Sequence, residues 1–285
     1  MIPALSVRGL NKSFGTFALK GITFEVPQGT VCAIIGENGS GKSSTLECIL
    51  GIDIPDSGNI SIYGINPQEN IDAHSLVGVA FDSCPFPENC TAADLQTILK
   101  GVFKNWNSTL YSALIEECKI PLHQKIRTFS RGMKAKLDIV CALCHEADLL
   151  ILDEATAGLD PVIREEMIDQ LLNFMQDEKH AILMTSHISS DLERIADYII
   201  FIKDGQIVFI EQKDLLLAEY GMACVSSDQL EYIAVEFIVR LRKQAMNTDL
   251  LIRNRAEFSK RYPDYSLRPA SLDEIVLMFT RGKTL

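Results

Sequence analysis

Residues 31–43 read VCAIIGENGSGKS, and this stretch decides the fold of the 285-residue chain. Its first five residues form a continuous apolar run, as in a strand that is buried on both faces. A glycine-rich loop follows. Leu46, Ile49 and Leu50 then recur at helical spacing until Gly51. The stretch therefore predicts a buried strand, a tight loop and a helix in direct succession.

The loop at 36–43 matches the pattern G-x-x-x-x-G-K-[ST] without a gap. Glycines let backbone N–H groups approach a phosphate closely, and the following helix adds its positive end. In such loops the lysine reaches the β- and γ-phosphates and the hydroxyl ligates Mg²⁺. A random chain of this length would contain the pattern about once in 100. The residues expected to contact a nucleotide here are Gly36, Asn38, Gly39, Ser40, Gly41, Lys42, Ser43 and Ser44.

A second apolar run, Leu149–Leu152, ends in the acid pair Asp153 and Glu154. A buried strand would deliver both carboxylates to the sheet edge where ligands of open α/β sheets bind. Asp153 is a candidate Mg²⁺ ligand. Glu154 is a candidate base for the attacking water, a role that contributes about 10²–10⁴-fold. A strand that merely ends in a polar loop is the alternative, but the phosphate loop favours the functional interpretation.

Strand-like and helix-like segments alternate along most of the chain, which predicts an α/β fold with a mostly parallel sheet. We expect a P-loop NTPase domain over 1–220 that begins with an antiparallel β subdomain. A helical insertion is expected at about 85–145, with Thr91 as a helix N-cap. The remaining residues, 221–285, read as a small C-terminal α+β appendage.

Bulk properties narrow the function classes. The formal net charge of −11 disfavours a broad nucleic-acid surface. No apolar run reaches the roughly 20 residues that span a bilayer, so we expect a cytoplasmic protein. Eight scattered cysteines fit a reducing compartment. Cys141, Cys144 and His145 match a haem-attachment pattern, but the cysteines lie on an apolar helical face, and we interpret them as core.

Further motifs occur in a fixed order, and with them residues 1 to about 218 resemble the ATPases of the ABC (ATP-binding cassette) family. FSRGM at 129–133 is similar to the family's signature, usually written LSGGQ. AGLD at 157–160 resembles its D-loop. His187 resembles the switch histidine that contacts the γ-phosphate, and Phe14 sits where the family places a ring under adenine. Phe17 is a nearby rival for that last role.

The resemblance implies binding and hydrolysis of ATP with Mg²⁺ in a head-to-tail homodimer or with a paired ABC subunit. It assigns catalysis to Glu154 and His187 in one subunit. It implies that Ser130 and Gly132 of the other subunit lie across the γ-phosphate. Asp160 is also expected at the nucleotide, and Ser130 is expected to cap the helix behind it.

Two departures from the family pattern stand out. Asp82 occupies the position of the Q-loop glutamine, which normally helps bind Mg²⁺, so the expected metal set is Ser43, Asp82 and Asp153. Arg131 and Met133 replace the usual signature residues. Such variants resemble simple bacterial exporters with a separate permease, including peptide-antibiotic exporters.

The resemblance therefore implies an ATPase subunit that powers an integral membrane permease from the cytoplasmic face, with export favoured as the direction. The alternative is a soluble ABC ATPase of translation or DNA repair. Such proteins usually carry two cassettes, coiled coils or zinc modules, whereas this sequence has one phosphate loop, no heptad run and no zinc cluster. A P-loop kinase outside the family is a third possibility, which FSRGM and His187 disfavour.

Overall fold

A computed structural model describes residues 2–186 and 188–284. The chain forms two compact units, residues 1–208 and 209–285, and each is described by itself. None of the helices within the described ranges is long and apolar enough to cross a membrane.

The first unit is built on a six-stranded sheet in the order β5-β6-β7-β3-β8-β9. The strands are β3 (Val31–Ile35), β5 (Val77–Phe81), β6 (Leu149–Asp153), β7 (Ala181–Thr185), β8 (Tyr198–Lys203) and β9 (Gln206–Gln212). Strands β5, β6, β7, β3 and β8 pair in parallel. This mostly parallel α/β sheet confirms the predicted fold class. The register aligns Phe81 with Asp153 and Asp153 with Thr185, so these strand ends meet at one edge.

An antiparallel sheet in the order β2-β1-β4 accompanies the parallel one. Its strands are β1 (Leu5–Phe14), β2 (Phe17–Val26) and β4 (Ser57–Ile62). The core of this unit includes fully buried Leu5 and Ile22 from these strands, Ile34 from β3 and Ile49 from α1 (Lys42–Ile49). The remaining helices outside the helical insertion are α2 (Asp72–Ser75), α6 (Pro161–Phe174) and α7 (Ser189–Ile195). Pro161 occupies the first turn of α6.

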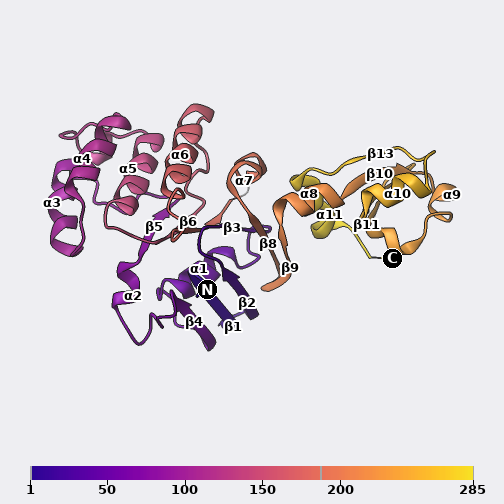
Figure 1. The fold of residues 1–285 in the computed structure, drawn as a ribbon, viewed down its shortest axis with the longest axis horizontal. Helices are drawn as coiled ribbons and strands as arrows, with labels where there is room; N and C mark the ends of the chain where they lie inside the picture. Colours follow the sequence, from indigo (N-terminus) through magenta and orange to yellow (C-terminus); the bar gives the residue numbers. More distant parts are fainter. Residues whose placement is uncertain (1, 187, 285) are drawn as a thin grey trace. The chain divides into compact units, whose positions relative to one another are not determined.

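The segment between β5 and β6 is helical, as expected, with α3 (Ala92–Val102), α4 (Ser108–Glu117), the short 3₁₀ helix η1 (Ile126–Thr128) and α5 (Arg131–Leu143). Figure 1 shows α3, α4 and α5 grouped beside β5. Thr91 caps α3, as predicted, and Asp94 completes a reciprocal capping box. Helix α5 packs so closely on β5 that a Cβ added to Gly78 would lie 2.4 Å from the carbonyl oxygen of Ala142.

The second unit is an α+β structure, in line with the expected appendage. Its antiparallel sheet has the order β11-β12-β10-β13. Its strands are β10 (Gly221–Val225), β11 (Ile238–Lys243), β12 (Thr248–Ile252) and β13 (Leu267–Pro269). Its helices are α8 (Lys213–Glu219), α9 (Ser227–Leu230), η2 (Val235–Phe237), α10 (Arg255–Arg261) and α11 (Leu272–Arg281).

The two units divide within β9, whereas the sequence predicts a domain boundary at 220. Within the second unit, Arg253 pairs with Glu211 near the end of β9 and with Glu219 of α8. Helix α8 thus belongs to the second unit, in which Arg253 contacts it. A functional boundary at 220 stays a prediction.

Candidate nucleotide-binding site

The loop between β3 and α1 has no room for side chains at its two ends. A Cβ on Gly36 would lie 2.2 Å from the carbonyl oxygen of Ile202. A Cβ on Gly41 would lie 2.7 Å from Leu19, and the φ of Gly41 is 110°. Glycine is therefore required at both positions, and the backbone between them remains open to a ligand.

Lys42 is buried at the start of α1. Its Nζ donates to the carbonyl oxygens of Gly36 and Glu37, at 2.9 and 3.2 Å. Burial lowers the pKa of Lys42, while the charges of Glu154 and Asp153 act in the opposite direction. The buried hydroxyl of Ser40 has no hydrogen-bond partner among the described atoms. A buried ammonium surrounded by loop carbonyls, with an unsatisfied hydroxyl nearby, fits a bound phosphate.

Thr185 connects the two carboxylate residues at the end of β6. Its hydroxyl donates to Asp153 Oδ1 at 2.6 Å and accepts from the backbone N–H of Glu154 at 3.0 Å. Glu154 has a φ of 51°, a left-handed conformation that is unusual for a residue with a side chain. Thr185 was not among the predicted site residues. The feature of the sequence that could have indicated Thr185 is a polar residue at the end of a buried strand, and this strand pairs with the one that carries the acids.

The expected metal ligands fit Mg²⁺ in part. Asp153 lies half-buried at the sheet edge, and Ser43 is exposed in the first turn of α1, followed by half-buried Ser44. No three His, Cys, Asp or Glu side chains gather around one point in the described ranges. A triphosphate-bound Mg²⁺ needs few protein ligands, because phosphate oxygens and waters complete its octahedron. Oxygen donors on Ser43 and Asp153 suit that ion.

Two phenyl rings lie close to the phosphate loop. Phe14 stacks on Phe17 with ring centroids 6.2 Å apart, and the ammonium of Lys12 lies 5.7 Å from the Phe14 ring. Phe17 would contact a Cβ at Gly41, at 3.0 Å. Phe14 and Phe17 are both half-buried.

The signature-like residues surround the N-terminus of α5. Ser130 caps the helix, as predicted, by accepting from the N–H of Met133 at 3.2 Å. Gly132 packs closely on α6, since an added Cβ would lie 2.4 Å from the terminal Cδ1 of Ile163. Asp160 caps α6 and accepts from the N–H groups of Val162 and Ile163, both at 3.1 Å. Ser130 and Asp160 are exposed, so each can contact a further group.

The strand order separates this helix from the chain's own phosphate loop. Helix α5 packs on β5, while the loop follows β3, and β6 and β7 lie between these two strands. With strands about 4.8 Å apart, β5 and β3 are roughly 14 Å apart. The signature-like residues thus lie on a helix that packs three strands away from the strand before the phosphate loop.

Asp82 directly follows β5, and its Oδ1 accepts from Nη2 of Arg131 at 2.5 Å. The assignment of Asp82 to a metal stays a prediction, and it requires this ion pair to open.

His187, the expected switch histidine, lies outside the described residues. Asn38 and Gly39 lie exposed in the loop.

Cys141 and Cys144 are buried in and after α5, and His145 stacks on Phe103 with ring centroids 4.2 Å apart. Burial lowers the pKa of His145. These contacts are those of a packed core.

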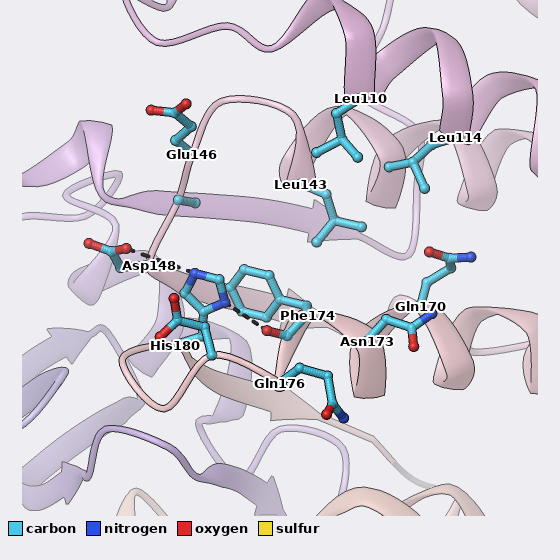
Figure 2. Close-up of a pocket in the computed structure, with 12 residues that line it drawn as sticks. Leu110, Leu114, Leu143, Glu146, Asp148, Gln170, Asn173, Phe174, Gln176 and His180 are labelled. Atoms are coloured by element: carbon cyan, nitrogen blue, oxygen red, sulfur yellow. Dashed lines mark hydrogen bonds and ion pairs between the residues drawn. The ribbon is translucent and has the colours of Figure 1, made fainter.

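A separate cavity of about 480 Å³ lies between α4, α6 and the amino ends of β6 and β7. Figure 2 shows the His180 ring stacked on Phe174, with Asp148 on the other side of His180. Asp148 and His180 directly precede β6 and β7. The cavity is therefore at the opposite sheet edge from the phosphate loop, where nucleotides do not bind in folds of this class.

A sequence profile of the family described as ABC transporter matches residues 19–157. The bacitracin transport ATP-binding protein BcrA of Enterococcus faecalis is 31% identical over 210 residues, covering 72% of this chain and 68% of BcrA. The lantibiotic transport ATP-binding protein SrtF of Streptococcus pyogenes is 32% identical over 212 residues, covering 74% of this chain and 91% of SrtF. A solved ATP binding subunit of an ABC transporter superposes with a TM-score of 0.69 at 27% identity, covering 75% of this chain and 92% of the other.

Proposed function

Because this chain belongs to the ATP-binding proteins of ABC transporters, we propose that it hydrolyses Mg²⁺-ATP between two subunits to drive export through a separate membrane permease. The observation that carries the proposal is the common sheet edge, which the loop after β3 shares with Asp153 and Glu154 at the end of β6. Family membership supports ATP as the nucleotide.

In this proposal, Lys42 and the backbone N–H groups of the loop hold the phosphates of ATP. Phe14 stacks on adenine. Ser43 and Asp153 hold Mg²⁺, which neutralises charge on the phosphates when it is bound. The carboxylate of Glu154 accepts a proton from the attacking water, and Thr185 fixes the backbone that carries this carboxylate.

The second subunit is proposed to complete the site. Ser130 and Gly132 at the N-terminus of α5 would contact the γ-phosphate held by the first subunit, because a helix N-terminus and its N–H groups favour an anion. His187 and Asp160 are proposed to contact the same region. The partner is a second copy or a paired ABC subunit.

Export is proposed because relatives are named for bacitracin and lantibiotic transport. The permease would hold the chain at the cytoplasmic face of the membrane. A role in translation or DNA repair is not favoured by these relatives. Co-purification of the tagged chain with a polytopic membrane protein is expected, and recovery with ribosomes or DNA instead would overturn the transport assignment.

The Glu154→Gln variant tests the chemistry. It should bind ATP, lose nearly all hydrolysis and accumulate as an ATP-bound dimer in sedimentation experiments. Glu116→Gln, an exposed change on α4, is the matched control and should hydrolyse ATP normally. Normal hydrolysis by Glu154→Gln would contradict the proposed base.

A further inference from the structure

The two departures from the family pattern contact each other. Asp82 follows β5, Arg131 opens α5, and the two are joined by the 2.5 Å ion pair. The Arg131 guanidinium also lies over the backbone of Gly158, where an added Cβ would be 2.3 Å from Nη1. One side chain of the signature-like segment thus contacts both the Q-loop position and the D-loop.

Helix electrostatics indicate that Arg131 needs an anion where it stands. A cation in the first turn of a helix opposes the helix dipole. Helix α5 has no acidic residue in its own first turn, so Asp82 supplies the negative charge from another element.

We propose that Asp82 masks Arg131 in the nucleotide-free subunit, and that Arg131 is released to bind the γ-phosphate of ATP held by a second subunit. This rests on the proposed function, since Ser130 beside it is the residue proposed to meet that phosphate. Both side chains are more than half exposed, at 57% and 53%, so the pair is weak enough to exchange partners. A γ-phosphate carries more charge than a carboxylate and accepts a bidentate guanidinium.

The exchange is a side-chain movement, because the helix itself is attached to β5. Asp138 on α5 accepts from the N–H of Phe81 at 2.9 Å, and Ala142 lies against Gly78. These contacts are independent of Arg131. Its guanidinium can therefore turn away from Asp82 while the backbone of α5 stays on β5.

The test uses the full chain with Glu154→Gln, so that hydrolysis is blocked, and measures the ATP concentration for half-maximal dimerisation by sedimentation. Asp82→Asn should lower this concentration about two- to fivefold, the range expected for loss of an exposed ion pair. Arg131→Gln should raise it. Asp82→Asn added to Arg131→Gln should cause no further change, because the masked group is gone. The charge swap, Asp82→Arg with Arg131→Asp, should behave like Arg131→Gln.

Glu25→Gln removes a comparable exposed pair with Arg8 on the antiparallel sheet and serves as the control. It should leave the ATP response unchanged. If Asp82→Asn has no effect, or acts equally with and without Arg131, the masking is refuted while the dimer remains. If the Glu154→Gln chain binds ATP but never dimerises, both the proposed function and the masking fail. Thermal melts of each variant identify any chain that misfolds. If a single variant misfolds, the charge-swap variant tests the masking in the same ATP titration.

Discussion

The buried carboxylate of Asp138 on α5 accepts a hydrogen bond from the backbone N–H of Phe81, the residue before Asp82. The bond therefore ties the signature-like helix to the strand that ends at the Q-loop position. Burial raises the pKa of Asp138 to about 7, and the Phe81 N–H only partly offsets this.

Asp138 should make stability depend on pH. An unfolded Asp ionises near pH 4, so between about pH 4 and 7 the folded chain holds a proton that the unfolded chain has lost. The free energy of unfolding should therefore fall as the pH rises from about 4 to about 7, by an amount on the order of a few kcal/mol. Urea melts of the parent and Asp138→Asn should show the variant lacking this fall.

Glu116→Gln on the exposed face of α4 is the control for that comparison and should keep the parental pH profile. Parallel profiles for the parent and Asp138→Asn would show that burial does not perturb this carboxyl.

Two glycines of the phosphate loop should differ in their tolerance of alanine. At Gly36 a Cβ would meet a backbone carbonyl at 2.2 Å, which cannot move cheaply. We expect Gly36→Ala to lower the free energy of unfolding by about 1–3 kcal/mol or more. At Gly39 nothing lies within 4 Å of an added Cβ. The cost of alanine there comes from its left-handed φ of +79° alone and is about 1 kcal/mol. Equal losses for the two variants in denaturant melts would argue against this packing.

Lys42 should contribute to ATP affinity through its charge. A hydrogen bond to a charged group contributes roughly 1.5–3 kcal/mol, so Lys42→Met should weaken ATP binding about 10- to 100-fold. Titration with a fluorescent ATP analogue measures this. Lys20→Met, at an exposed position on β2, is the control. Unchanged affinity in Lys42→Met would remove Lys42 from the site.

Thr185 should act on the rate through Asp153 and Glu154. Thr185→Val keeps the shape but loses both hydrogen bonds, so we expect kcat to fall about 10- to 100-fold with little change in KM for ATP. Thr185→Ser keeps the hydroxyl and should restore most of the rate. A Ser variant as slow as the Val variant would mean that packing, and not the hydroxyl, matters at this position.

Local features of the sequence were sufficient to predict the elements that carry the site. β3 begins and ends as expected because five apolar residues are bounded by Thr30 and Gly36. The starts of α3 and α5 followed from the predicted capping residues Thr91 and Ser130, whereas the capping of α6 by Asp160 was not predicted. Signals of this kind act within a few residues, so they can be recognised without the fold.

Contacts between distant segments could not be predicted in the same way. Asp82 and Arg131 are 49 residues apart, Phe81 and Asp138 are 57 apart, and Asp153 and Thr185 are 32 apart. Each pair depends on the strand order and on the packing of α5 on β5, which apolar periodicity leaves open. On α3, Leu95 is buried, whereas Ile98 and Val102 at the same helical spacing reach the surface.

Mixing two inactive variants tests the central claim, that one subunit's phosphate loop works with the other's signature-like helix. Lys42→Ala damages the loop and Ser130→Phe damages the helix, so each alone should be nearly inactive. A mixed dimer would contain one intact site, and random pairing should restore about a quarter of the parental ATPase activity. Recovery near that level on mixing is the predicted result. A mixture no more active than the two separate variants would contradict a site shared between subunits.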